Sequence, residues 1–432
     1  MTHLVVEKLD EVYMRVYGEP SIEQELSDFF TYEYPGAKYT PKYKARLWDG
    51  KIRMYDAVRK TLYIGLLEYL EKFCASNEYT LSYKTDFVPN NTKITTDSIW
   101  DYAKALNLTA RGTPIEIRDY QVEAIKTALA KERALILSPT GSGKSLIIYS
   151  LIRWHIAHGR KCIIIVPTTS LVEQLYSDFE DYSGKNKFSV EKHCQKLYSG
   201  FPKDFTKNVL ITTWQSCYQQ SKAWFRQFDV VIGDEAHQFK AKSLTTVMEK
   251  MDETQYRIGT TGTLDDKKVH RLVLQGIFGN IHRVTTTRAL MDSNRLSDLK
   301  IRCVVLKYDE SIRKVVAKKK YQDEYDWIIS NYKRNKIIRD ISVQCEGITL
   351  VLFQLVQKHG KVLHEMIKEK VGDDRKVYFI HGGVDTSTRE EIRREAAKDG
   401  NCIIVASFQT YATGINLPGI ENIIFASPTK AK

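Results

Sequence analysis

Short apolar runs alternate with helical patterns over residues 115–284 of this chain. The runs that read as strands are residues 134–137, 162–166, 209–212, 230–232 and 256–259. Because these runs are apolar almost throughout rather than alternately polar, both faces of the sheet that they form must be covered. Helices between successive strands provide that cover through right-handed crossovers. The pattern therefore predicts an α/β domain with a buried parallel sheet.

The same pattern returns nearer the C-terminus, at residues 301–306, 348–353, 377–380, 402–405 and 422–425. It predicts a second α/β domain with a charged helical insertion at about residues 310–343. The first hundred residues read instead as a small, basic α+β unit. There, Asp49-Gly50 predicts a hairpin between residues 43–48 and 51–55, because both turn positions favour positive φ. We therefore expect three domains, at residues 1–97, 98–290 and 291–432.

The excess of basic over acidic residues indicates which class of molecule the protein binds. Lys and Arg outnumber Asp and Glu by 65 to 53, which favours nucleic acid over an acidic membrane surface. No apolar run approaches the roughly 18 residues of a membrane span, and the N-terminus lacks the shape of a signal peptide. The seven cysteines form no Cys-x-x-Cys pair, which disfavours zinc and indicates reduced thiols. We expect a cytoplasmic protein without a membrane partner.

A glycine-rich segment follows the strand at residues 134–137 and opens an apolar helix. Such a turn aims several backbone N–H groups at one point, where the helix dipole also favours an anion. The Lys144 ammonium can then reach the outer phosphates of a nucleotide, and the Ser145 hydroxyl can ligate Mg²⁺. Ser138 replaces the first glycine of the usual pattern, so an ordinary strand–helix turn is the competing interpretation. The context favours a nucleotide site made by Thr140, Gly141, Ser142, Gly143, Lys144 and Ser145.

Hydrolysis of a nucleotide also needs a carboxylate that orients the metal and a group that positions water. Asp234-Glu235-Ala236-His237 supplies both after the apolar run at residues 230–232. We expect Asp234 beside the Mg²⁺ ion, and Glu235 beside the attacking water as the general base. Acidic pairs after strands are common on protein surfaces, so the preceding phosphate loop is what favours a catalytic role.

Together these segments resemble the motor core of the superfamily 2 helicases and translocases. The resemblance implies two tandem RecA-like parallel-sheet motor domains that bind ATP and Mg²⁺. It implies a catalytic set made of Lys144, Asp234, Glu235 and His237. Thr261-Gly262-Thr263 stands where the family links the ATP state to domain movement.

Several weaker matches follow in the family's order. They imply that Arg118 and Gln121 lie beside the nucleotide, with the glutamine on the adenine edge, and that Gly414 and Asn416 lie near the ATP cleft. They also imply nucleic-acid contacts from Pro167, Thr168, Thr212 and Thr413. Each match alone is also ordinary loop chemistry, and it is their common order that favours the family.

One departure from the family lies at the C-terminus. The family's motor ends in a Gln-x-x-Gly-Arg-x-x-Arg segment whose arginines reach the ATP cleft. The sequence stops at Pro428-Thr429-Lys430-Ala431-Lys432, where that segment is expected to begin. Arginine fingers contribute about 10³–10⁵ in rate. We therefore expect the second motor domain to be truncated and this chain to hydrolyse ATP poorly.

A basic and aromatic stretch lies between Lys38 and Lys60. It holds eight basic residues against two acidic ones, interleaved with Tyr39, Tyr43, Trp48 and Tyr55. This mixture suits phosphate neutralisation combined with base stacking, and a half-buried hairpin with solvated lysines is the competing interpretation. We expect nucleic-acid contacts from Lys42, Lys44, Arg46, Lys51 and Arg53.

A basic domain ahead of a compact motor resembles the bacteriophage recombination helicases of the same superfamily. The resemblance implies Holliday junction branch migration, fork regression and R-loop unwinding during recombination, repair and replication. It further implies a monomer that acts on branched or duplex DNA in the cytoplasm of the host cell. Two alternatives stay open: an RNA-directed remodelling ATPase, which stimulation by RNA would favour, and a non-catalytic DNA-binding fragment, which binding without turnover would favour.

Overall fold

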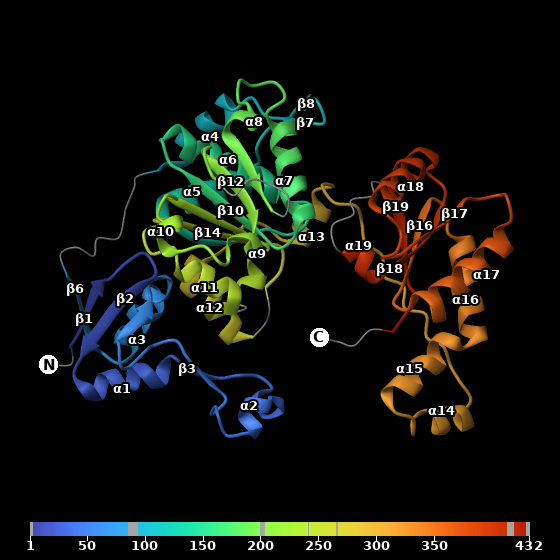
Figure 1. Cartoon of the computed structure of the whole chain (residues 1–432), viewed down its shortest axis with the longest axis horizontal. Helices are drawn as coiled ribbons and strands as arrows, with labels where there is room; N and C mark the ends of the chain where they lie inside the picture. The colour runs from blue at the N-terminus through green and yellow to red at the C-terminus, as the bar shows by residue number, and fades with distance from the viewer. Residues whose placement is uncertain are drawn as a thin grey trace. The chain divides into compact units, whose positions relative to one another are not determined.

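A computed structural model describes residues 3–84, 94–198, 204–240, 242–264, 267–412 and 419–428. The chain divides into two compact units, Met1–Leu299 and Lys300–Lys432. Figure 1 shows each unit as helices packed around β-sheets, as the alternating sequence pattern predicts. Within the described ranges, no helix has the length and apolar character that a bilayer span requires.

The first sheet lies near the N-terminus and has the strand order β5-β2-β1-β6. Its strands are β5 (Thr61–Tyr63), β2 (Tyr13–Gly18), β1 (His3–Lys8) and β6 (Thr80–Tyr83). Helices α1 (Pro20–Phe29) and α3 (Leu67–Ser76) pack their apolar residues into the same core as this sheet. The N-terminal sheet and its helices therefore form the small α+β fold that the sequence predicts.

The predicted hairpin at Asp49-Gly50 is wrong. Residues 41–44 form the short helix α2 (Pro41–Lys44), which Thr40 caps, and β4 (Lys51–Arg53) pairs antiparallel with β3 (Thr31–Glu33). Gly50 has the expected positive φ of 77°. Proline at the first helical position and a threonine cap start a helix at this point. Gly50 thus has the expected conformation, but Asp49 does not have the positive φ that was expected of it, and the strand partner comes from before the basic stretch.

The second sheet of this unit has seven strands in the order β11-β12-β10-β13-β14-β9-β15, and all neighbouring pairs are parallel. The five predicted strands are confirmed as β9 (Arg133–Leu137), β10 (Cys162–Val166), β12 (Val209–Thr213), β13 (Val230–Asp234) and β14 (Tyr256–Thr261). Two edge strands, β11 (Cys194–Leu197) and β15 (Ile281–Arg283), were not predicted. Short edge strands carry less of the apolar signal, because one side of each is open.

Both faces of this sheet are buried, as the apolar strands require. Successive residues of β10 point to opposite faces, so Ile164 belongs to one core cluster and Ile163 to the other. The first cluster includes residues of α4 (Thr96–Ala105), α5 (Asp119–Lys131), α6 (Lys144–Ala157) and α7 (Thr169–Tyr182). The second includes residues of α9 (Trp214–Cys217), α10 (Lys222–Phe225), α11 (Lys242–Glu249) and α12 (Lys268–Phe278).

The N-terminal sheet is joined to this motor sheet by buried polar contacts. The hydroxyls of Tyr13 and Tyr63 both donate to Oε1 of Glu249, at 3.0 and 2.5 Å, and their rings stack 4.9 Å apart. Arg133 Nη2 donates to the backbone oxygen of Glu11 at 2.6 Å and to its Oε2 at 2.5 Å. Val269 and Leu272 of α12 also belong to the N-terminal core. These contacts fix the small domain relative to α12.

The second unit contains a four-stranded parallel sheet in the order β17-β18-β16-β19, which are Val377–Ile380, Ile403–Ser407, Ile348–Phe353 and Ile420–Phe425. The charged insertion is helical, as predicted, and forms α14 (Glu310–Val316), α15 (Tyr321–Ser330) and α16 (Tyr332–Gln344). Buried His359 ties α16 to the end of β19, because its ring nitrogens lie 3.2 Å from Asn335 Oδ1 and 2.9 Å from Ser427 Oγ.

The predicted strand at residues 301–306 is wrong. These residues have no regular secondary structure, and Ile301 and Val305 are each 79% exposed. A β-branched run forms a strand only where a neighbouring strand completes its hydrogen bonds and packing. Among the described residues, no strand pairs with this run.

Candidate functional site

The glycine-rich loop connects the C-terminal end of β9 to the first turn of α6. Gly141 and Gly143 have φ values of 82° and 83°, a region that residues with a Cβ rarely occupy. The loop is braced from within, because Ser142 Oγ donates to the Pro139 oxygen at 2.6 Å and lies 2.5 Å from Ser138 Oγ. Ser138 therefore takes part in holding the loop at the position where the usual pattern has glycine.

Lys144 connects this loop to two carboxylates that follow β13. Its Nζ lies 2.9 Å from Asp234 Oδ1 and also contacts Glu235 Oε1. Asp234 is almost fully buried, and its Oδ1 also accepts from the Glu235 N–H at 2.9 Å and from the Thr260 hydroxyl at 2.8 Å. Thr260 was not among the predicted site residues, although it directly precedes Thr261-Gly262-Thr263. The tertiary fold thus assembles the predicted catalytic set.

The electrostatics of this set keep both partners charged. Burial opposes the charge on Lys144, but the nearby Asp234 and Glu235 carboxylates outweigh it and raise the pKa of the lysine. A hydrogen bond from His237 and the Lys144 charge lower the pKa of Glu235 to about 2. Glu235 also has a φ of 50°, which is strained for a residue with a side chain. This conformation allows its backbone N–H to bond Asp234 while its carboxylate reaches Lys144.

His237 lies between Glu235 and the end of β14. Its Nδ1 is 3.3 Å from Glu235 Oε2 and 3.0 Å from the Thr261 hydroxyl, which in turn donates to the Thr263 oxygen at 2.8 Å. A continuous set of polar contacts therefore runs from the carboxylate after β13 to the segment after β14. Both contacts use Nδ1, and together they hold this edge of the histidine ring between Glu235 and Thr261.

The metal-ligand residues predicted for Mg²⁺ are Ser145 and Asp234. Their hydroxyl and carboxylate oxygens are the hard donors that Mg²⁺ prefers. The contacts of Asp234 described above all use Oδ1. No cluster of three or more His, Cys, Asp or Glu side chains able to hold a metal occurs in the described part of the chain. The donor set therefore fits a Mg²⁺ ion that takes its remaining ligands from phosphate and water.

The hydroxyl of Ser145 has a partner that sequence reasoning missed. It lies 2.8 Å from the Tyr182 hydroxyl at the end of α7. Tyr182 is distant in sequence and lies in no motif, so no local signal identifies it. The contact uses one hydrogen-bonding position of the Ser145 hydroxyl when no metal is present.

The structure places Gln121 against the phosphate loop. Its Nε2 donates to the Ser142 oxygen at 2.8 Å, and its Oε1 accepts from the Arg118 N–H at 2.9 Å. A Cβ added to Gly143 would lie 2.2 Å from Gln121 Nε2, so the glycine is also required for this close approach. Arg118 itself donates to the Tyr120 hydroxyl at 2.6 Å. Both predicted residues therefore lie at the start of α5, beside the loop.

The predicted nucleic-acid residues of the motor separate into three groups. Pro167 and Thr168 lie half-buried at the C-terminal end of β10, where Thr168 caps α7. Thr212 is fully buried, and its hydroxyl donates to the Leu197 oxygen at 2.8 Å. This placement contradicts the prediction for Thr212, because its side chain is used inside the sheet. Thr413, Gly414 and Asn416 lie outside the described residues.

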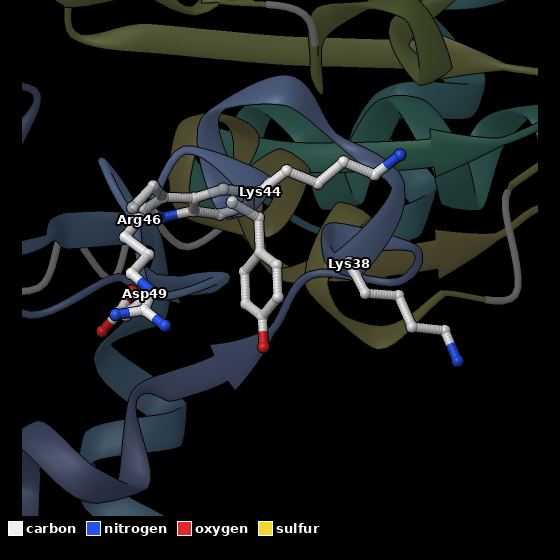
Figure 2. A pocket seen from close by; sticks show the side chains of 6 residues that line it. Lys38, Lys44, Arg46 and Asp49 are labelled. Carbon is white, nitrogen blue, oxygen red and sulfur yellow. The ribbon is translucent and has the colours of Figure 1, made fainter.

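The basic stretch, in the segment that connects β3 to β4, forms an open pocket (Figure 2). The pocket has a volume of about 490 Å³ and is lined by Lys38, Tyr43, Lys44, Arg46, Trp48 and Asp49. Lys42 and Lys51 are also exposed, whereas Arg53 pairs with Asp49 at 2.5 Å. The five predicted basic residues thus lie in one exposed segment, although not on the hairpin that was expected.

Models of three protein families match successive parts of the chain. Residues 4–84 match "DNA helicase UvsW, N-terminal", residues 114–266 match "Type III restriction enzyme, res subunit", and residues 332–431 match "Helicase conserved C-terminal domain". The first match includes the basic segment, and the second includes the phosphate loop and the Asp234–His237 segment.

Individual relatives agree with these matches. The chain is 31% identical over 431 residues to the ATP-dependent DNA helicase uvsW of Enterobacteria phage T4, which covers 98% of this chain and 84% of that protein. The crystal structure of T4 UvsW matches 100% of this chain and 85% of its own, with a TM-score of 0.61 at 30% identity. A shorter match, 28% over 150 residues, is to the DNA 3'-5' translocase XPB2 of Sulfurisphaera tokodaii and covers 34% of this chain and 31% of that protein.

Proposed function

The chain belongs to the uvsW family of ATP-dependent DNA helicases, and from this membership we propose that it uses ATP to remodel branched DNA. The proposed reactions are branch migration of Holliday junctions, regression of forks and unwinding of R-loops. The protein would act as a monomer in the cytoplasm of a host cell. The observation that carries the ATPase part is the contact of Lys144 with Asp234 and Glu235 beside the phosphate loop.

The phosphate loop would receive the triphosphate of ATP. Its backbone N–H groups and the N-terminus of α6 favour a multiply charged anion. Lys144 would leave the two carboxylates and pair with the outer phosphates, an exchange of one set of anionic partners for another. Gln121 is positioned beside the same loop through Ser142 and would contact the base.

Release of Lys144 would free the carboxylates for their catalytic roles. Ser145 and Asp234 would hold Mg²⁺, which supplies charge neutralisation at the phosphates. Glu235 would orient the attacking water and accept its proton. His237 would keep Glu235 aligned, and its contact with Thr261 would pass the state of the site to the segment after β14.

DNA would contact this unit at two places. Pro167 and Thr168 lie at the carboxyl end of the motor sheet, where a loop can grip the backbone without reading sequence. Lys42, Lys44 and Arg46 in the N-terminal domain take part in no ion pair between described residues and would neutralise phosphates. We expect the triple change of these three residues to alanine to lower the slope of log affinity against log salt by about two to three.

A matched control for this measurement is the pair Arg59 and Lys60. Both lie in the same domain, but they pair with Asp56 and Glu23 at 3.9 and 2.8 Å. Changing both to alanine should alter the slope by less than one. An unchanged slope in the triple variant would remove the N-terminal segment from the DNA-binding surface.

The function is tested by comparing ATP turnover with single-stranded DNA, duplex DNA, a four-way junction and RNA of equal length. We expect the junction to stimulate turnover most at equal nucleotide concentration. Greater stimulation by RNA would contradict the proposal, and so would turnover that no nucleic acid changes. The Glu235→Gln variant serves as the control, because it keeps the shape of the site and removes the general base.

A further inference from the structure

The pocket in the segment that connects β3 to β4 combines cations with aromatic rings (Figure 2). The side chains of Lys38 and Lys44 extend on one side, and those of Arg46 and Asp49 lie on the other. A volume of about 490 Å³ falls within the range of small-ligand pockets, which is roughly 300–1,000 Å³. The pocket is therefore large enough for a single nucleotide.

The charge of this pocket favours an anion. Lys38, Lys44 and Arg46 form no ion pair with any described carboxylate, and Lys38 has only the Tyr39 ring nearby, at 5.3 Å. The one acidic side chain, Asp49, is committed elsewhere. It pairs with Arg53 at 2.5 Å, and this contact lowers the pKa of Asp49 to about 2. Three cations thus face the pocket without a protein partner to neutralise them.

The aromatic walls are held in place by the protein. Trp48 Nε1 donates to the Lys51 oxygen at 2.9 Å, and its ring lies 5.6 Å from that of Tyr34. Tyr43 packs against the turn, because a Cβ at Gly50 would come within 3.0 Å of its ring. Rings that are already fixed lose little freedom when a ligand binds. The polar edge of Trp48 is satisfied internally, so its ring contributes a face to the pocket.

The segment that carries the pocket also rests on the motor. Lys268 of α12 lies 5.1 Å from the centre of the Tyr32 ring, and His270 of the same helix lies 6.4 Å from that of Tyr34. Helix α12 packs in turn against β9 and β14 of the motor sheet. A ligand in the pocket would therefore be held at a fixed distance from the ATP site of this unit.

We propose that this pocket binds one unpaired nucleotide of the DNA, with its base against Tyr43 and Trp48 and its phosphate on the cations. Paired bases are stacked within a duplex and expose only their edges, whereas an unpaired base offers its face to an aromatic ring. The proposal rests on the DNA helicase function and specifies it further: the N-terminal domain detects the unpaired nucleotide at a branch. A pocket of phosphate-binding cations alone would need no aromatic wall.

The test measures the affinity of the unaltered protein, without ATP, for three junctions of equal charge. One has two unpaired nucleotides at the branch, the second has abasic sites at those two positions, and the third is fully paired. Stacking against aromatic side chains contributes about 1–3 kcal/mol per base. We therefore expect the abasic junction to bind about 5- to 160-fold more weakly than the first. Equal affinities for these two junctions would overturn the proposal.

Two variants assign the preference to the pocket. Tyr43→Leu should reduce the difference in affinity between the unpaired and abasic junctions, whereas Tyr39→Leu, which changes a tyrosine that is 72% exposed beside the pocket, should keep the full difference. A preference of unchanged size in Tyr43→Leu would also overturn the proposal. The Lys44→Ala variant should weaken binding of all three junctions by a similar factor, because each retains its phosphates.

Failure of this proposal can be distinguished from failure of the helicase assignment. Junction-stimulated ATP turnover depends on Lys144 and Glu235, which lie outside the pocket. If the abasic and unpaired junctions bind equally but the junction still stimulates turnover, the pocket proposal is wrong and the helicase function stands.

Discussion

The Nζ atom of Lys144 lies 2.9 Å from Oδ1 of Asp234, so the lysine predicted to bind phosphate and the aspartate predicted to bind Mg²⁺ pair with each other. Glu235 contacts the same ammonium. This arrangement gives two neighbouring carboxylates one shared cationic partner when no nucleotide is present. Binding of Mg²⁺ and ATP would then substitute a metal for the lysine on one side and phosphates for the carboxylates on the other.

Lys144→Ala should abolish ATP hydrolysis while leaving DNA affinity within about twofold of the parent. The change removes the contact to the outer phosphates, and it also leaves Asp234 and Glu235 without their cation. We expect the free energy of unfolding to fall by about 1–3 kcal/mol. Steady-state turnover and urea denaturation measure the two effects. Lys104→Ala, at the exposed end of α4, is the control, and unchanged turnover in Lys144→Ala would remove the phosphate-loop assignment.

Tyr182→Phe should strengthen the binding of Mg²⁺ and a non-hydrolysable ATP analogue by about 2- to 10-fold. The hydroxyl of Ser145 lies 2.8 Å from that of Tyr182 when no metal is present, and we expect this contact to break when Ser145 ligates the metal. Removing a partner that exists only before binding favours the bound state, and a net hydrogen bond contributes about 0.5–1.5 kcal/mol. Calorimetric titration measures the affinity. Tyr149→Phe removes a nearby buried hydroxyl that bonds Ser183 instead, and it should leave the affinity unchanged.

Thr212→Val should leave DNA affinity unchanged and lower the free energy of unfolding by about 0.5–1.5 kcal/mol. The reason is that the Thr212 hydroxyl is buried and bonds the Leu197 oxygen of the neighbouring strand. Thr168→Ala should weaken DNA binding, because Thr168 lies at the end of β10 where a DNA contact is expected, and it should also lower the free energy of unfolding by about 0.5–2 kcal/mol, because the Thr168 side chain caps α7. Anisotropy titrations with labelled duplex separate the two. A loss of DNA affinity in Thr212→Val would restore the role that the structure contradicts.

Acid should destabilise the protein through His155, which lies fully buried in α6. Burial first, and then the charge of Arg160, lower the pKa of His155 to about 3 from the ordinary 6.5. The unfolded chain therefore binds a proton below pH 6.5 that the folded protein accepts only near pH 3. The contribution of neutral His155 to the free energy of unfolding is complete above about pH 6.5. It declines as the pH falls toward 3, by at most about 1.4 kcal/mol per pH unit.

The variant His155→Phe isolates this effect. Between pH 6.5 and pH 5, the free energy of unfolding of the parent should fall by up to about 2 kcal/mol more than that of His155→Phe, as measured by urea denaturation. The ring of His155 packs 4.6 Å from that of Tyr256, and its Nε2 has no hydrogen-bond partner among the described residues, so phenylalanine fits this position. His158→Gln, on the exposed end of the same helix, should keep the dependence of the parent. An equal decline in parent and His155→Phe would contradict the assignment.

The sequence by itself determined the strands and loops that a short stretch of residues specifies. All five predicted strands of the first motor sheet are present, because a run that is apolar on both faces can only lie inside a covered sheet. Strand order was not predicted, but parallel strands all end at one edge of their sheet, and the ends of β9 and β13 therefore bring Lys144 and Asp234 to the same edge. The phosphate loop, the acidic pair and the family could be identified for the same reason: each is a short segment with its own chemistry.

The tertiary structure decided which strands pair and which side chains contact residues that are distant in the sequence. The run at residues 301–306 has strand composition but pairs with no described strand, and β4 pairs with β3 rather than with the residues just before it. Thr212 and Thr168 look alike in sequence, yet only Thr212 has its hydroxyl buried against a neighbouring strand. Tyr182 reaches Ser145 from the far end of another helix. Side-chain hydrogen bonds and strand pairing join residues that are distant along the chain, and so no local pattern specifies them.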